Sequence, residues 1–247
     1  MRLLRVIRFS TKLNFKIDAK TAAPMYRLAK TLQQVSAPRL FEECLKLFLN
    51  GHAVANYKLL NKYNFMFYLM PCLTQLTISK DRAKRLVSNI LTNTDQRVRS
   101  GKSVTPSFTY AALMWPTVQK ESIKYLKSGK SAYMAQKRAA DEVISKQIQI
   151  IAIPKRYTSA IREIWQLQLL LQKKEGAARL MSNPRFRAAY DLLILREYSG
   201  ESLDGTGMWW TKYQEQHRPT KFKTQKVRPY KKSKRQKYFL PKIEGDF

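Results

Sequence analysis

The stretch of residues 153–196 constrains the fold of this chain most strongly, because it predicts two consecutive amphipathic helices. Pro154 and Thr158 are the start signals of the first helix, and Gly176 is its expected stop. Its apolar residues fall close to an i, i+3, i+4, i+8 spacing and form one stripe: Ile161, Ile164, Trp165 and Leu169. Since an isolated helix cannot bury such a stripe, the rest of the chain must supply helical partners.

The second helix of this stretch has a clear start, with Asn183 as N-cap and Pro184 at the first helical position. Its predicted core face follows the helical spacing and contains Phe186, Ala189, Tyr190, Leu193 and Ile194. The charged residues are expected off this face, and they are Arg185, Arg187, Asp191 and Arg196. Arg187 and Asp191 are four residues apart, which predicts an ion pair on the helix surface.

Helical patterns also dominate the remainder of the chain, and no period-two strand pattern is convincing. Asp18 is expected to cap a helix that runs to Val35 with a kink at Pro24, and Ser36 a helix that ends at Gly51. Further helices are predicted over residues 1–13, 57–63, 64–69, 80–99, 108–115, 117–127, 131–151 and 208–216. The predicted fold class is therefore all-α, a helical array of two layers.

The chain carries a large positive charge, because its 247 residues include 47 Lys and Arg against 17 Asp and Glu, a formal net charge of +30. Its 44% hydrophobic and 11% aromatic residues favour a folded core rather than a disordered basic polymer. A folded body with this field favours a polyanionic partner, nucleic acid first and a membrane surface second. No stretch reaches the ~18 uncharged apolar residues of a membrane helix, so no membrane partner is expected.

Basic residues at two places in the folded part are candidates for contacts with RNA phosphates. Along the N-terminal helix, a basic face is predicted above a core of Leu3, Leu4, Ile7 and Phe9, and this face contains Arg2, Arg5, Arg8 and Lys12. A mitochondrial presequence has a similar composition and is the less favoured interpretation of residues 1–16. The second place is the turn before the two-helix stretch, which contains Lys155 and Arg156.

A third basic group lies in residues 217–247, where the composition shifts and prolines recur. These residues predict a disordered arm that contacts phosphates, and three aromatic residues among them could stack on bases. The candidate RNA-binding residues of this arm are Arg218, Lys221, Lys223, Lys226, Arg228, Lys231, Lys232, Lys234, Arg235 and Lys237. The aromatic residues are Tyr230, Tyr238 and Phe239.

The chemistry of nucleotidyl transfer has no evident residues in this chain, since it requires clustered carboxylates that hold divalent metals. No D-x-D occurs, and the nearest pattern is Glu244-Gly-Asp246 in the basic arm. Adjacent acids such as Glu42 and Glu43 should splay apart on a helix. No catalytic residue and no metal ligand is therefore expected.

Other reactive residue types give no site either. His52 and His217 have no neighbours at ligand spacing, so a zinc site is not predicted. Cys44 and Cys72 lie inside apolar helical patterns and are expected to be buried, reduced thiols.

Several long segments resemble a known family. The segments RLLRVIRFSTKL and RLFEECLKLF are similar to the neck of bacterial poly(A) polymerases, which are class II nucleotidyltransferases related to the CCA-adding enzymes. NTDQRV, VTPSFTYAALMW, IPKRYTSAIREIWQLQ and NPRFRAAYDLL resemble the body and the arginine-rich C-terminal region of the same polymerases. The resemblance covers most of residues 1–198 and implies three parts: a neck and RNA-binding domain over 1–75, a C-terminal helical domain over 76–216, and a basic tail over 217–247.

The chain departs from the family in its expected lack of a catalytic head, whose metal-binding D-x-D, glycine-containing loop and R-R-D motif do not occur. Arg2 matches the arginine of the family's E-D-x-x-R motif, which reads the incoming base, and the chain begins inside that motif. Arg39 and Glu42 match a neck motif with a supporting role at the nucleotide pocket. The resemblance implies ATP and magnesium as cofactors of the intact family member, with none held by this chain.

The expected function is the RNA-binding portion of a cytoplasmic poly(A) polymerase, which acts in RNA 3′ polyadenylation and mRNA processing. One alternative is a subunit of a split polymerase, with the catalytic head supplied as a separate partner chain. A structural RNA-binding protein of the ribosomal type is the other alternative. In each case the partner is RNA, and the chain alone is expected to transfer no nucleotide.

Overall fold

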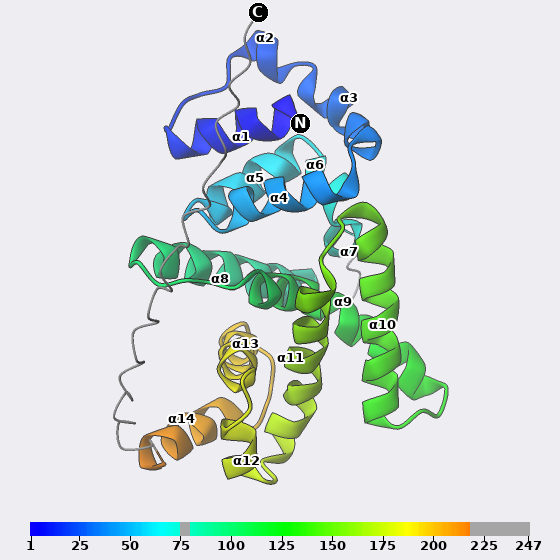
Figure 1. Cartoon of the computed structure of the whole chain (residues 1–247), viewed down its shortest axis with the longest axis vertical. Coiled ribbons are helices and arrows are strands. Elements are labelled where there is room, and N and C mark those ends of the chain that lie inside the picture. The colour runs from blue at the N-terminus through cyan, green and yellow to red at the C-terminus, as the bar shows by residue number, and fades with distance from the viewer. Residues whose placement is uncertain (75–79, 218–247) are drawn as a thin grey trace, which may run out of the picture.

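A computed structural model describes residues 1–74 and 80–217, and these residues form helices without any strand (Figure 1). The all-α prediction is confirmed. The α-helices are α1 (Arg2–Lys12), α2 (Ala19–Ala22), α3 (Met25–Leu28), α4 (Ala37–Phe48), α5 (Ala53–Lys62), α6 (Phe65–Leu69), α7 (Pro71–Thr74), α8 (Lys80–Arg99), α9 (Pro106–Lys127), α10 (Ala132–Ile150), α11 (Lys155–Lys173), α12 (Ala177–Met181), α13 (Phe186–Tyr198) and α14 (Thr206–Gln216). One 3₁₀ helix, η1 (Ala29–Gln34), follows α3.

One continuous apolar core connects these helices, from Leu4 in α1 to Trp210 in α14. In Figure 1, α1–α6 form the upper group, α8 crosses the middle, and α9–α14 lie beside and below it. Helix α9 packs against α10 and α11, and α11 packs against α13. The division of the helical part at residue 75 remains a prediction.

The two-helix stretch folds as predicted in outline, as α11 and α13, but its boundaries differ. Helix α11 ends at Lys173, and the residue that follows it, Lys174, has a left-handed φ of 61°, so the predicted stop at Gly176 comes too late in the chain. Gly176 instead precedes the short helix α12, which the apolar pattern did not predict. The predicted start of the second helix is wrong by two residues, because α13 begins at Phe186 with Arg185 as its N-cap. Asn183 Oδ1 accepts a hydrogen bond from the Arg185 amide at 2.7 Å in the turn before the helix.

The central contact of this core is made by Trp165, whose side chain is fully buried and whose Nε1 donates to the Ala111 carbonyl at 2.8 Å. This bond joins α11 to α9. Gln168 joins α11 to α13, because its Nε2 donates to the Ala189 carbonyl at 2.9 Å. The predicted stripe of α11 is thus confirmed for its inner residues, while Leu169 is only half-buried.

Helix α13 is buried on more sides than its predicted core face. Leu192 and Leu195 are buried besides the predicted apolar residues, and Ile194 is only half-buried. The expectation that Arg196 lies off the core is wrong, since the residue is 2% exposed. A helix surrounded by α8, α9, α11 and α14 has little surface left for solvent.

Two prolines were predicted to disturb helices, and only one of them interrupts its helix. Helix α9 continues through Pro116, so the predicted division into two helices at this residue is wrong. Residues Ser107 to Pro116 and Val118 are buried against neighbouring helices, and this burial offsets the ~3 kcal/mol that an interior proline costs. At Pro24, by contrast, the predicted kink is a full interruption between α2 and α3. Asp18 does cap α2, because its Oδ2 accepts from the Lys20 amide at 2.9 Å.

Candidate nucleic-acid interface

Helix α1 is held on α4 and α5 by one buried face. Leu4 and Ile7 are 0% exposed beneath it. Thr11 Oγ1 donates to Asn56 Oδ1 at 2.7 Å, and Asn56 Nδ2 donates to the Leu47 carbonyl at 2.7 Å, which links α1, α5 and α4. Since Asn56 is itself buried, these bonds are shielded from water and fix the rotation of α1. The opposite face of α1 therefore points to solvent.

The predicted basic residues of α1 lie on or beside this exposed face. Arg2, Arg5 and Lys12 are exposed, and Arg8 is half-buried. Arg5 has one nearby acid, with its Nε 3.9 Å from Glu43 Oε1, a distance that gives only a weak ion pair. The guanidinium of Arg8 lies 4.7 Å from the centre of the Phe9 ring. The face therefore presents four cations with little compensating charge.

Exposed aromatic rings lie beside these cations. Their exposure was not predicted from the sequence. Phe9 was expected in the core of α1, and this expectation is wrong because the residue is 47% exposed. Phe15, just after α1, is 67% exposed. The sequence does contain a signal for this exposure. Phe9 lies about 160° around the helix axis from the core residue Ile7, and it follows Arg8 directly. Exposed rings beside cations form a surface on which nucleic-acid bases stack.

The matched neck residues Arg39 and Glu42 are both exposed on α4. Burial and the nearby charge of Arg39 lower the pKa of the Met1 amino group, so Arg39 lies close to the start of α1. The adjacent acid Glu43 is 3% exposed and faces α1 instead, with its Oε1 3.9 Å from Arg5 Nε of α1 and 3.1 Å from Lys46 Nζ of α4. The two acids splay apart as expected, and the supporting role of Arg39 and Glu42 remains a prediction.

Lys155 and Arg156 are exposed at the start of α11. The Arg156 guanidinium lies 4.8 Å from the Tyr157 ring centre, and the Tyr157 ring lies 5.8 Å from that of Phe41 in α4. These contacts bring the second basic place beside the helix on which α1 rests. The third group, Arg218 to Lys237 in the tail, lies outside the described residues.

Three rings stack in a row, here called the ladder, along α14 and the residue that follows it. This arrangement was not predicted from the sequence. The Trp209 and Tyr213 rings are 5.0 Å apart at an interplanar angle of 12°, and the Tyr213 and His217 rings are 4.0 Å apart at 18°. The i, i+4, i+8 spacing of these residues was the available signal. His217 is exposed and is the last described residue before the basic tail sequence.

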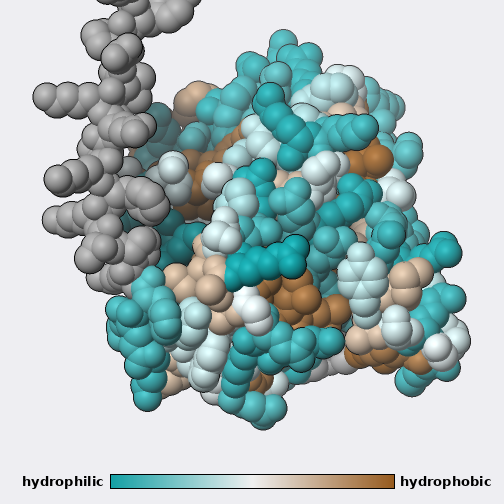
Figure 2. Space-filling view, turned by 60° about the horizontal axis from the view of Figure 1, so that its bottom comes forward, coloured by the Kyte–Doolittle hydropathy of each residue, from teal (hydrophilic) through white to brown (hydrophobic). Residues whose placement is uncertain are grey.

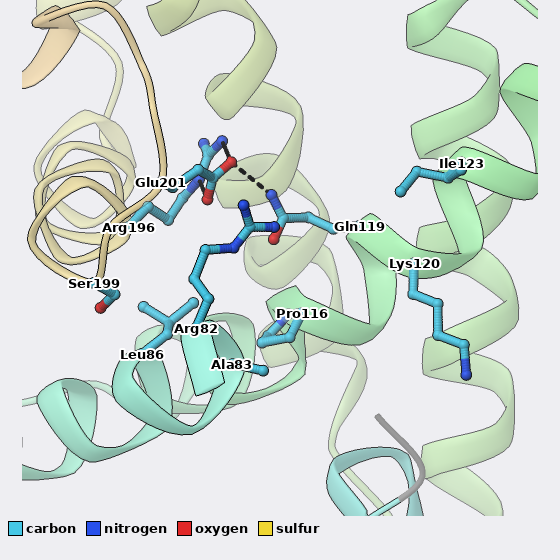
Figure 3. Close-up of a pocket in the computed structure, with 10 residues that line it drawn as sticks. All are labelled: Arg82, Ala83, Leu86, Pro116, Gln119, Lys120, Ile123, Arg196, Ser199 and Glu201. Carbon is cyan, nitrogen blue, oxygen red and sulfur yellow. Dashed lines mark hydrogen bonds and ion pairs between the residues drawn. The ribbon is translucent and has the colours of Figure 1, made fainter. Parts of the chain in front are cut away.

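The cavity drawn in Figure 3 is structural rather than a ligand site. Its volume is about 30 Å³, roughly the space of one water molecule. Arg196 Nε and Nη2 donate to the two oxygens of Glu201 at 3.0 and 2.7 Å, and Gln119 Nε2 donates to Glu201 at 2.7 Å. Arg196 also donates to Gln168 Oε1 at 2.8 Å. These bonds satisfy the buried charges and join α9, α11 and α13.

The thiols and acids of the described residues offer little reactive chemistry. Both cysteines are free, and burial raises the pKa of the Cys44 thiol to about 12 and that of Cys72 to about 11. Among residues 1–74 and 80–217, no group of three or more His, Cys, Asp or Glu side chains could hold a metal ion. The described residues thus offer no cluster of three or more such ligands for the magnesium that the resemblance implies for the intact family member.

Hydrophilic residues predominate on the face shown in Figure 2, and hydrophobic residues appear near its centre and in smaller groups elsewhere on this face. Within the part of the chain that the structure describes, no helix combines the length and apolar character needed to cross a membrane. Fold and surface together define an all-α, strongly basic helical array of the kind that binds polyanions.

Comparisons with known proteins specify the family. Residues 14–76 match the model described as "Probable RNA and SrmB- binding site of polymerase A", and residues 128–240 match "Polymerase A arginine-rich C-terminus". The chain therefore contains the RNA-binding and arginine-rich C-terminal regions of the bacterial poly(A) polymerase family. The first of these regions includes α4 and α5, the two helices that support α1.

Curated relatives agree with this assignment. Poly(A) polymerase I of Salmonella typhi is 38% identical over 221 residues, which are 87% of this chain and 48% of the relative. Poly(A) polymerase I of Escherichia coli O157:H7 is 38% identical over 222 residues, with the same coverage. The enzyme of that name from Haemophilus influenzae is 35% identical over 252 residues, 98% of this chain and 55% of the relative. The chain thus spans about half the length of the relatives it matches.

Proposed function

We propose that this chain is the RNA-binding portion of a bacterial poly(A) polymerase and that the exposed face of α1 contacts single-stranded RNA. The observation that carries the proposal is the row of Arg2, Arg5, Arg8 and Lys12 on one side of a helix whose other side is fixed by buried contacts. Cations on a rigid helix neutralise RNA phosphates and release counterions, which supplies affinity without reading sequence.

The charge around this helix favours an anionic partner. Residues 1–74 contain twelve Lys and Arg residues but only three acids, Asp18, Glu42 and Glu43. Glu43 is buried beneath α1, so only Asp18 and Glu42 remain on the surface of this segment. The exposed rings of Phe9 and Phe15 add stacking, which is sequence-tolerant because every base has a π-face.

The activity of the whole polymerase is a further part of the proposal. Transfer of AMP to an RNA 3′ end would need ATP and magnesium, held by a catalytic head whose residues are not among those described. This head would be part of the same polypeptide or a separate partner chain, and Arg2 would complete its base-reading motif. The site of action would be the bacterial cytoplasm, where RNA 3′ ends are processed.

The test is RNA affinity as a function of salt. Arg2, Arg5 and Lys12 are exposed, so replacing all three with Gln should leave the fold intact. The matched control replaces Lys127, Lys130 and Lys137 with Gln; these residues are also exposed but lie on α9 and α10 and in the turn between them. Binding of a fluorescein-labelled single-stranded RNA would be followed by anisotropy between 50 and 300 mM salt, conditions chosen to resolve counterion release.

The α1 variant should bind more weakly at low salt and give a shallower slope of log affinity against log salt. For three lost phosphate contacts the slope should change by about 2, taking ~0.7 per contact for single strands. The control variant should change the slope much less, because its charges act only at long range. Equal effects of the two variants would show that RNA senses only the net charge, and the proposed face would then be wrong.

A further inference from the structure

Three separate sequence segments meet at one cavity. They are residues 93–98, 104–115 and 183–193, the segments NTDQRV, VTPSFTYAALMW and NPRFRAAYDLL. The cavity has a volume of about 210 Å³ and lies between the end of α8, the start of α9 and the start of α13. It is about seven times larger than the cavity in Figure 3, so it has room for a small polar group such as a phosphate.

The lining of this cavity is positively charged. Arg97 Nη1 lies 3.2 Å from Asp191 Oδ2, and Arg187 Nε lies 3.0 Å from Asp191 Oδ1. A single carboxylate is thus shared by two guanidiniums, and one positive charge is left without local compensation. Arg185 also lines the cavity, and its ion pair at 3.3 Å is with Glu163, whose side chain is 50% exposed. An ion pair of this exposure is weak, so Arg185 adds to the excess positive charge.

The environment of these arginines is partly screened from water. The Asp191 side chain is 18% exposed and that of Arg97 is 33% exposed. Burial raises the pKa of Asp191, although the neighbouring Arg187 and Arg97 oppose the rise. Hydrogen bonds between arginine and an anion are stronger in such a setting than on the open surface. Arg187 is 66% exposed, so the cavity remains open to an incoming chain.

Backbone groups at the mouth of the cavity reinforce its charge. Helix α9 has 22 residues and begins here, with Thr105 as its N-cap accepting a hydrogen bond from the Phe108 amide at 3.3 Å. The N-terminal end of a long helix carries a partial positive charge. Val104, Phe108 and Ile164 form an apolar side of the same cavity. A cationic end beside an apolar wall suits a phosphate joined to a sugar and base.

We propose that this cavity binds a backbone phosphate of single-stranded RNA, with Arg97 and Arg187 as the donors and Asp191 as the group the phosphate competes with. The proposal rests on the RNA-binding function proposed above and adds a second, defined contact point far along the chain from α1. The bound phosphate would accept hydrogen bonds from N–H groups of Arg97 and Arg187, which are both paired with the Asp191 carboxylate in its absence. Arg185 would contribute long-range attraction at the rim.

The competition predicts opposite effects for two single substitutions in the full chain. Arg187→Gln removes a donor and should weaken binding of the labelled single-stranded RNA roughly tenfold at low salt, the magnitude of one charge-assisted bond. Asp191→Asn keeps the side-chain shape but removes the competing charge, and it should strengthen binding several-fold. A gain in affinity at an unchanged melting temperature does not arise from misfolding, so this variant keeps the test informative even if the other is unstable.

A matched control exists in the pair Arg162 and Asp141, whose Nε and Oδ1 atoms are 2.8 Å apart on another part of the surface. Arg162→Gln and Asp141→Asn should change RNA affinity by less than about twofold, since they alter only the long-range field. If Asp191→Asn weakens binding or leaves it unchanged while melting at the wild-type temperature, the cavity has a purely structural role and the inference is wrong.

The source of the phosphate is tested separately, with inorganic phosphate and AMP as competitors of RNA and as ligands on their own. NMR signals of the arginine Nε–H groups in ¹⁵N-labelled chain should shift on adding RNA, and Arg187→Gln should remove one of them. Saturation by AMP at concentrations that leave RNA affinity unchanged would identify a nucleotide site and overturn the RNA assignment. Loss of RNA binding in the α1 variant with no effect at Arg187 would overturn this inference alone, whereas phosphate binding without RNA binding would overturn the proposed function.

Discussion

Removing Glu201 should destabilise the fold strongly, because it leaves the charge of Arg196 in the core. The side chains of Arg196 and Glu201 are only 3% and 12% exposed, so neither is screened by water. In the Glu201→Ala variant Arg196 loses two hydrogen bonds and keeps only Gln168 Oε1 and the Trp115 ring, 4.6 Å from its guanidinium carbon. Breaking a buried pair in this way costs about 3–5 kcal/mol of unfolding free energy.

The assay is urea unfolding followed by circular dichroism at neutral pH, with thermal melting alongside. For a chain of this size the expected loss corresponds to a fall of roughly 6–20 °C in melting temperature. The double variant Arg196→Met with Glu201→Leu should recover part of the loss, because no unpaired charge then remains in the core. A cost below about 1 kcal/mol for Glu201→Ala would refute this account of the buried pair.

The same pair gives a pH dependence with a definite sign. Burial raises the pKa of Glu201, but the hydrogen bonds and charge of Arg196 outweigh burial and hold it below its ordinary value of 4.5. A carboxylate with a lowered folded-state pKa stabilises the fold above that ordinary value. This stabilisation is therefore lost as the pH falls from 4.5 through the folded-state pKa, and the Glu201→Gln variant should show a smaller loss over the same range.

Three further predictions concern the core, the basic tail and a thiol. Trp165→Ala should cost about 3–5 kcal/mol by urea unfolding, because the ring is fully buried and its bond to Ala111 is lost; a near-native melting temperature would contradict this. Deleting residues 218–247 should leave the melting temperature nearly unchanged but make the salt slope of RNA binding shallower by roughly 3.5, for about five phosphate contacts. Cys44, with its pKa raised to about 12, should react with a thiol reagent at pH 8 only on unfolding, and rapid labelling of the native chain would refute its burial.

Much of the fold was predictable from helical periodicity, because long amphipathic patterns determine helices with little help from context. Helix α8 has the predicted bounds, and α10 and α11 differ from prediction by a residue or two at their ends. The errors occur where tertiary packing overrides a local rule. Pro116 stays inside a helix because the surrounding turns are buried, and Lys174 takes the left-handed conformation that is commonest for glycine.

Buried polar residues were the least predictable part of the structure. The position of Arg196 in the helical pattern is that of an ordinary surface arginine. Nothing in its local sequence indicates that its guanidinium will be buried and hydrogen-bonded to Glu201 and Gln168. Asp95 is similar: it is 5% exposed and its carboxylate accepts from the Ala53 amide at 2.6 Å, at the start of a helix more than forty residues away. Such partners are distant in sequence, so a periodic pattern cannot assign them.

The candidate interface was predicted in part. The basic face of α1 follows from the spacing of its arginines, whereas the exposure of Phe9 depends on which side of α1 packs against α4 and α5. The convergence of Arg97, Arg187 and Asp191 on one cavity required the fold itself, since the residues are up to 94 positions apart.

The central claim is that RNA contacts the exposed face of α1, and photo-cross-linking tests it most directly. A single-stranded RNA containing 4-thiouridine would be bound to the full chain at low salt, irradiated, and the modified peptides identified by mass spectrometry. Stacking on Phe9 and Phe15 predicts adducts on these rings, and their loss in the Arg2, Arg5 and Lys12 triple variant. Efficient cross-links elsewhere on the chain, with none within residues 1–20, would contradict the account.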